Sequence, residues 1–169
     1  MINDNLFLRY EFKYFISSKI SNEIFNQSLN FMKIDNFALK NKNKGYLVRS
    51  LYFDNDQYNN FFEKVDGIKI RKKFRIRSYS NNKKDNPNLF LEMKGRKNQK
   101  TYKLRTPILS NHLEYLVDRN KVMSLMNYYS KDNKVVSDFI YETLKKKIEP
   151  KVVVDYNRRP YINKFGLLF

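Results

Sequence analysis

One stretch of the chain alternates between cations and apolar residues: Asp66-Gly67-Ile68-Lys69-Ile70-Arg71-Lys72-Lys73-Phe74-Arg75-Ile76-Arg77-Ser78-Tyr79. Asp66-Gly67 is a typical turn dipeptide, and successive side chains of a strand point to opposite faces of its sheet. A strand ending near Ser80 therefore has one cationic face and one mostly apolar face. Because rows of like charges repel one another, we expect the cationic face to line water, a groove or an anionic ligand.

Two later segments repeat this pattern. Residues 89–96 place Glu92 and Lys94 on one face and leucines and a methionine on the other, and residues 101–109 place Lys103 and Arg105 in phase. Three adjacent strands each have a basic face. Closing such a sheet would surround a polar tunnel with these faces, whereas an open sheet would form a basic plate. A solvated sheet face is the simpler interpretation of the charges.

The remaining segments complete an expected α+β fold of one domain over residues 1–169. Alternation or β-branched residues predict strands over residues 6–16, 46–54 and 151–161, and helical spacing predicts helices near residues 17–32, 55–64, 110–126 and 135–147. Residues 165–169 have the pattern of a strand that begins there, which predicts further strands after Phe169. We expect His112, close to a helix start, to lie at the surface.

Composition limits the chemistry that is available. The 34 Lys and Arg against 17 Asp and Glu give a formal net charge of +17, which attracts polyanions such as nucleic acid, acidic membranes, nucleotides and polyphosphate. The chain has no Cys and one His, so thiolate and multi-histidine sites are excluded and any metal needs oxygen ligands, as Mg2+ and Mn2+ do. The sequence contains neither an apolar run of about 20 residues nor a signal-peptide start, which predicts a cytoplasmic protein without a membrane segment.

Taken together, the segments resemble the VTC domain, the polyphosphate polymerase domain of the vacuolar transporter chaperone family. That family belongs to the triphosphate tunnel metalloenzymes, which include the CYTH domains. The matching segments are Arg9-Tyr10-Glu11-Phe12-Lys13-Tyr14, Val48-Arg49-Ser50-Leu51-Tyr52-Phe53-Asp54, Glu63-Lys64 with Gly67, Arg71 to Tyr79, Phe90-Leu91-Glu92-Met93-Lys94, Tyr102-Lys103-Leu104-Arg105 and Val154 to Tyr161. They occur in the family's order and cover nearly the whole chain.

The resemblance implies an antiparallel β tunnel with helices packed outside and a basic lumen that binds ATP and polyphosphate. The residues at positions of the family's catalytic, phosphate-contacting set are Lys13, Arg75, Arg77, Lys94, Lys103 and Arg158. Further cations expected to bind the nucleotide are Arg71, Lys73 and Arg105. Glu11 and Glu92 are candidate ligands for Mn2+ or Mg2+, and the family's main metal-binding Glu is expected in a strand beyond Phe169.

The resemblance predicts an ATP-dependent polyphosphate polymerase that transfers the γ-phosphate of ATP to a polyphosphate chain. Two alternatives remain open: an inorganic or nucleoside triphosphatase of the same fold, in which water is the acceptor, and a noncatalytic module that binds polyphosphate or nucleic acid. Readers of nucleic acid expose aromatic rings beside cations so that bases can stack. In the most basic strand Phe74 lies opposite the cations, so we expect no sequence-specific binding of nucleic acid.

Overall fold

The computed structural model describes residues 12–41, 44–79, 89–98 and 100–164. The chain forms two compact units, one within Arg49–Asp155 and the other made of Tyr10–Val48 and Tyr156–Phe169. The boundaries between the two units fall inside two long strands, one over residues 46–54 and the other over residues 149–158. Each of these strands therefore contributes residues to both units. Each unit is described below by itself.

A five-stranded sheet carries the basic segments. Its strands are β2 (Tyr46–Asp54), β3 (Ile70–Ser78), β4 (Leu89–Lys97), β5 (Lys100–Ile108) and β6 (Glu149–Arg158), in the order β5-β4-β3-β2-β6. The pairs β2–β3, β3–β4 and β4–β5 are antiparallel. The predicted strands match β2 to β5 to within about two residues at each end, whereas β6 begins two residues and ends three residues earlier than predicted. An α+β fold with an antiparallel sheet is confirmed.

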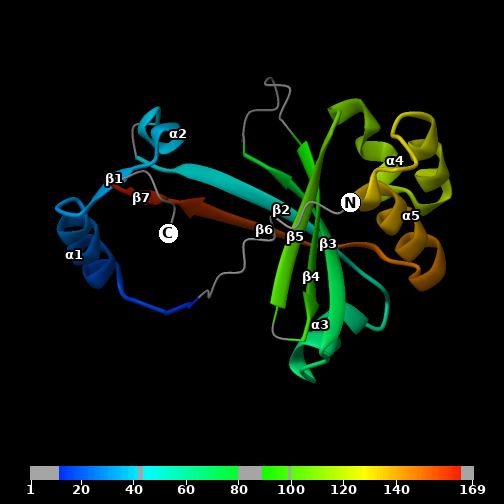
Figure 1. The fold of residues 1–169 in the computed structure, drawn as a ribbon, viewed down its shortest axis with the longest axis horizontal. Coiled ribbons are helices and arrows are strands. Elements are labelled where there is room, and N and C mark those ends of the chain that lie inside the picture. The colour runs from blue at the N-terminus through cyan, green and yellow to red at the C-terminus, as the bar shows by residue number, and fades with distance from the viewer. Residues whose placement is uncertain (1–11, 42–43, 80–88, 99, 165–169) are drawn as a thin grey trace. The chain divides into compact units, whose positions relative to one another are not determined.

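Helices follow the strands of the first unit. They are α3 (Asn59–Val65), η1 (Ser110–His112), α4 (Leu113–Val117), η2 (Arg119–Asn127) and α5 (Lys134–Lys146), and Figure 1 shows α4 and α5 on one side of the sheet. Side-chain oxygens cap the helix starts by accepting backbone N–H groups that have no partner within the helix. Asn133 accepts from Val136 at the start of α5, and Asp54 accepts from Asn60 and Phe61 at the start of α3.

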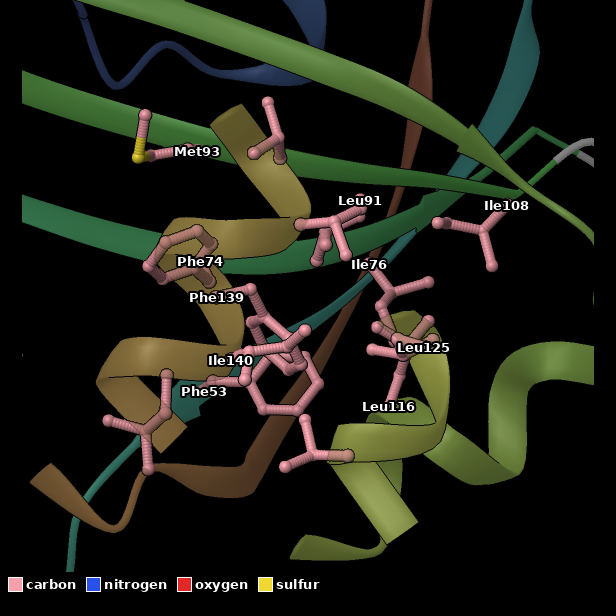
Figure 2. Close-up of a cluster of buried hydrophobic side chains, with 14 of the residues drawn as sticks. Phe53, Phe74, Ile76, Leu91, Met93, Ile108, Leu116, Leu125, Phe139 and Ile140 are labelled. Carbon is pink, nitrogen blue, oxygen red and sulfur yellow. The ribbon is translucent and has the colours of Figure 1, made fainter. Parts of the chain in front are cut away.

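The apolar sides of β3 and β4 form the core with α5. Phe74 of β3 is 1% exposed, and its ring centroid lies 5.4 Å from that of Phe139 on α5 in an edge-to-face contact. Phe53 of β2 makes a second edge-to-face contact with Phe139 at 5.1 Å. Figure 2 shows these rings with Leu91 and Met93 of β4 in one buried cluster. The predicted packing of the apolar strand face on helices is confirmed, and it leaves the cationic residues on the opposite face.

The second unit contains two helices and a small sheet. Its elements are α1 (Ser18–Ser28), β1 (Met32–Ile34), α2 (Asn36–Leu39) and β7 (Tyr161–Asn163), and β1 pairs antiparallel with β7. Ser17 caps α1, and the helix ends at Ser28, short of the predicted end near residue 32, because residues 32–34 pair with β7 instead. The strand predicted over residues 6–16 is wrong for residues 12–16, which belong to no helix or strand, and residues 6–11 lie outside the described residues.

The prediction of a surface position for His112 is wrong. His112 is 6% exposed, and its Nδ1 lies 3.0 Å from the hydroxyl oxygen of Tyr129. Its ring also lies against Tyr128, with a centroid distance of 4.2 Å. Two tyrosines that directly follow η2, Tyr128 and Tyr129, therefore cover a histidine that the local sequence places at an exposed helix start.

Two further expectations concern a strand at residues 165–169 and membrane-spanning helices. Residues 165–169, expected to begin a strand, lie outside the described residues. Within the described residues, every helix is too short or too polar to cross a lipid bilayer.

Candidate anion-binding site

The antiparallel register aligns residues of β2 to β5, all but Phe90 polar, in three rows across the sheet, on the face opposite the core. The first row is Lys73, Lys94 and Lys103; the second is Tyr52, Arg75, Glu92 and Arg105; the third is Ser50, Arg77 and Phe90. Neighbouring strands are about 4.8 Å apart and same-face residues of one strand about 6.7 Å apart, so these side chains form a lattice of closely spaced charges. The structure thus brings together Arg75, Arg77, Lys94 and Lys103 of the predicted phosphate-contacting set.

Glu92 lies at the centre of this lattice and is 0% exposed. Its Oε2 accepts a hydrogen bond from Arg75 Nε at 2.8 Å and lies 2.6 Å from Arg75 Nη2. The same oxygen lies 3.8 Å from Arg77 Nη1, while Oε1 lies 3.4 Å from Lys103 Nζ. One carboxylate on β4 therefore contacts cations of both neighbouring strands.

These contacts keep both partners of the central ion pair charged. Burial by itself would raise the pKa of Glu92, but the positive charge and hydrogen bond of Arg75, with weaker help from Arg77 and Lys103, lower that pKa below its ordinary value. For Arg75, burial opposes the charged form, yet Glu92 and Tyr52 together raise the pKa of the guanidinium. Glu92 is accordingly an anion at neutral pH.

Arg75 and Arg77 are held by side chains of β2 as well. The hydroxyl of Tyr52 accepts a hydrogen bond from Arg75 Nη1 at 2.8 Å, and the hydroxyl of Ser50 accepts one from Arg77 Nε at 3.3 Å. Arg77 is 6% exposed, which is unusual for an arginine and is made possible by these polar contacts. Both guanidinium groups therefore have defined orientations before any ligand binds.

Ser50 and Tyr52 were not singled out from the sequence. The signal was present, because alternation in residues 46–54 puts both side chains in one phase and the apolar Leu51 and Phe53 in the other. What the alternation did not reveal is that β2 pairs with β3 in a register that places them opposite Arg77 and Arg75.

The lysine row has an excess of positive charge. Burial lowers the pKa of Lys73, and the nearby charges of Lys64, Lys94, Arg75 and Arg71 lower it further. The ammonium of Lys73 lies 5.8 Å from the ring centroid of Tyr52, which partly offsets the repulsion. An anion bound over this row would relieve the same repulsion and stabilise the charged form of Lys73.

The other two predicted nucleotide-binding cations lie at the edges of the lattice. Arg71, opposite Arg96 in the register, donates a hydrogen bond from Nη1 to the carbonyl of Ile68. Arg105 on β5 stacks over Phe90, with its guanidinium carbon 5.0 Å from the ring centroid. Both cations contribute to the positive potential of this face from defined positions.

The remaining predicted residues are not part of this lattice. Lys13 and Arg158 belong to the second unit, Lys13 in a segment without helix or strand and Arg158 as the last residue of β6. Glu11 lies outside the described residues.

The described residues do not fit a divalent metal ion. Within the described ranges, no three carboxylate or histidine side chains come together in a way that could hold one. Glu92 directs both carboxylate oxygens at cationic groups and has no exposed surface. The assignment of Glu92 as a ligand for Mn2+ or Mg2+ stays a prediction, and no step proposed below depends on a metal held by these residues.

Comparison with known proteins agrees with this geometry. A crystal structure of a protein from Bacillus halodurans, provisionally described as an adenylate cyclase, superimposes with a TM-score of 0.50 at 10% sequence identity. The match covers 86% of this chain and 62% of that one, so this chain spans less than two thirds of the length of that neighbour. No protein of curated function matches the sequence.

The likeness to this neighbour shows a tunnel-like α+β fold with an antiparallel sheet and packed helices. The family model of the VTC domain matches residues 8–165, which include every described cation of the lattice. The chain therefore belongs to the VTC domain family.

Proposed function

We propose that this domain binds the triphosphate of ATP on the cationic lattice and transfers the γ-phosphoryl group to a polyphosphate chain. The observation that carries the proposal is the alignment of Lys73, Lys94 and Lys103 in one row beside the row of Arg75 and Arg105. A linear polyanion has phosphoryl groups at regular intervals along its length. Two adjacent rows of cations can contact several of these groups at once.

The chemistry fits the residue types that the site contains. Transfer of a phosphoryl group proceeds through a loose transition state, in which positioning and charge neutralisation provide most of the catalysis. A terminal oxygen of the polyphosphate attacks the γ-phosphorus, and the bond from that phosphorus to the β–γ bridging oxygen breaks. ADP leaves with the electron pair. The attacking oxygen is already ionised, so no histidine or cysteine is required as a base.

Arginine and lysine have different roles in this proposal. A guanidinium donates parallel hydrogen bonds to phosphate oxygens and fixes their orientation, whereas an ammonium acts as a compact point charge. Arg75 and Arg77, whose orientations are set by Tyr52, Ser50 and Glu92, are suited to hold the reacting phosphoryl group. The lysine row is suited to an extended chain. We further propose that Lys13 and Arg158 contact phosphate, as their positions in the family's motif imply, and that residues 1–169 form a single domain.

The aromatic rings on this face favour a phosphate ligand over a nucleic acid. Arg105 covers one face of Phe90, and Tyr79 contacts the ring of Phe90 edge-on at 6.0 Å. Tyr52 lies against Arg75, with the guanidinium carbon 5.6 Å from its ring centroid. Bases stack on exposed ring faces, and in each of these cases a neighbouring cation or ring already contacts the aromatic residue.

The decisive experiment separates the products that the purified protein forms from ATP in the presence of Mn2+ or Mg2+. Long polyphosphate chains on a gel, together with ADP, support the proposed polymerase. Release of inorganic phosphate without chains would assign water as the acceptor and make the protein a triphosphatase. If ATP remained intact while polyphosphate bound, the domain would be a noncatalytic binding module.

The site itself is tested by the affinity for tripolyphosphate, measured by calorimetry. Each of Arg75→Ala and Arg77→Ala is expected to raise the Kd by about 10- to 150-fold, the equivalent of one charge-assisted contact. Arg49→Ala is the matched control, because Arg49 also forms an ion pair, with Asp155, but lies outside the three rows. If Arg75→Ala and Arg77→Ala bound tripolyphosphate as tightly as Arg49→Ala, the site would lie elsewhere.

A further inference from the structure

Glu92 is a buried acid in the middle of a face that we expect to bind polyanions. Its negative charge reduces the local charge of Arg75, Arg77 and Lys103 from three positive to two, and it occupies hydrogen-bond donors that a phosphate could use. On electrostatic grounds alone, the site would attract triphosphate more strongly without it. Its position therefore calls for a role that outweighs this loss.

The two oxygens of Glu92 divide the cations between two strands. Oε2 faces β3, where it contacts Arg75 and is 3.8 Å from Arg77, while Oε1 faces β5 and is 3.4 Å from Lys103. Arginine and lysine have many rotamers, and like charges at this spacing repel each other. A central carboxylate attracts all three cations to one point and so restricts the directions in which they can extend.

Arg75 shows how this restriction leaves the site able to bind. Glu92 contacts the Nε and Nη2 atoms of Arg75, and the Tyr52 hydroxyl contacts Nη1. Each terminal nitrogen of a guanidinium has two hydrogens, so a second N–H on Nη1 and on Nη2 can donate to a phosphate oxygen. Ordering the side chain in advance lowers the entropy that binding would otherwise cost.

We propose that Glu92 is a positioning residue that aligns Arg75, Arg77 and Lys103 for a linear triphosphate and so makes the site selective for it over monophosphate. This inference rests on the proposed function, since it concerns the ligand of the same site. Removal of the carboxylate strengthens the attraction for every anion to a similar degree. It weakens only the contacts of a ligand long enough to use several aligned cations.

Glu142 provides a matched control on the other side of the sheet. This carboxylate, on α5, is buried as well, with 6% exposure against 0% for Glu92, and lies 3.1 Å from the ammonium groups of Lys72 and Lys146. Glu142→Gln therefore removes a buried, doubly paired carboxylate from the same unit without touching the three rows. Any effect that it shares with Glu92→Gln reflects stability or net charge.

The test measures the Kd for tripolyphosphate and for inorganic phosphate in wild type, Glu92→Gln, Glu142→Gln and Arg75→Ala. Glu92→Gln is expected to lower the preference for tripolyphosphate over phosphate by about tenfold, which corresponds to the loss of order in two long side chains. Glu142→Gln is expected to leave the preference unchanged. Equal strengthening of both ligands in Glu92→Gln would show that Glu92 is only a competing charge and would overturn the proposal.

Two further measurements separate the remaining outcomes. Electron paramagnetic resonance measures Mn2+ binding to wild type and to Glu92→Gln in the absence of phosphate. If only the wild type bound Mn2+, Glu92 would be a metal ligand and the proposal would be overturned. If Glu92→Gln does not fold, Glu92→Asp keeps the charge but withdraws its oxygens, and an unchanged preference in that variant would refute positioning. Wild-type affinity in Arg75→Ala would instead refute the proposed site, whereas weak binding by Arg75→Ala with normal preference in Glu92→Gln refutes the positioning role alone.

Discussion

The ion pair of Arg75 with Glu92 predicts that two destabilising substitutions will partly cancel. Arg75→Ala leaves a carboxylate with 0% exposure without its main partner, and breaking a buried pair in this way costs about 3 to 5 kcal/mol of unfolding free energy. Arg77 at 3.8 Å and Lys103 at 3.4 Å still compensate part of the charge. We therefore expect a value near the lower limit, about 3 kcal/mol.

The same substitution should cost much less once the carboxylate is removed. In a Glu92→Gln background, Arg75→Ala removes one ordinary hydrogen bond to the amide, which contributes about 1 kcal/mol. The difference between the two backgrounds gives a coupling free energy of about 2 kcal/mol, within the range measured for residues in one ion-pair network.

Urea unfolding of wild type, the two single variants and the double variant at neutral pH measures this coupling directly. Arg49→Ala is the control, because the Arg49–Asp155 pair has a similar two-nitrogen geometry but its side chains are 54% and 37% exposed. An exposed pair contributes little, so Arg49→Ala should change stability far less than Arg75→Ala. Additive effects of Arg75→Ala and Glu92→Gln would show that the two side chains do not interact as described, and would refute the reasoning.

Three further predictions concern pH and packing. Folding lowers the pKa of Glu92, so its contribution to stability is present above its ordinary pKa of 4.5 and is lost as the pH falls through the lowered pKa. Unfolding measured over a series of acid pH values should therefore show a smaller difference in stability between wild type and Glu92→Gln only below pH 4.5. Because the pKa of Lys73 lies below its ordinary value of 10.5, the affinity for tripolyphosphate should fall as the pH approaches 10.5 from below. In calorimetry, Lys73→Arg should show a weaker dependence of this affinity on pH. Equal pH dependence in both proteins would exclude Lys73 as its source. At Gly95 an added Cβ would collide with the ring of Tyr102, so Gly95→Ala should lower the unfolding free energy by about 1 to 3 kcal/mol. If Gly95→Ala cost as much in a Tyr102→Ala background, the collision with this ring would not be its cause.

Local alternation was sufficient to predict most of the large sheet. In the middle of β3 and β4 the charged residues alternate with Phe74, Ile76, Leu91 and Met93, which lie in the core, so a single strand contains the information about which face is buried. The predicted strand over residues 46–54 matches β2 for the same reason. Sequence also identified the cations of the lattice by their shared phase, before any pairing was known.

The partners of those cations depend on register, which alternation does not contain. Glu92 is in phase with Lys94 on its own strand, yet its carboxylate contacts Arg75 and Lys103, which the pairing of β4 with β3 and β5 places beside it. The pairing of β1 with β7 was missed because each strand has three residues and about three quarters of the chain separates them. His112 was misplaced for a similar reason, since Tyr128 and Tyr129 cover it from the end of η2.

Charge is distributed unequally between the two sides of the sheet, and this difference identifies the site better than the net charge of +17 does. Beside α5, salt bridges join three lysines to three acids: Lys72, Lys134 and Lys146 with Glu63, Asp138 and Glu142. On the opposite face, the three rows contain six cations and the single carboxylate of Glu92. If the lysines reflected composition alone, positive and negative charges would be distributed similarly on the two faces. Instead, one face is neutralised and the other has an excess of positive charge. The imbalance therefore supports a polyanionic ligand for the rows. It also gives the buried Glu92 a role, because before the ligand binds this carboxylate is the only negative charge in the rows that can hold the aligned cations in place.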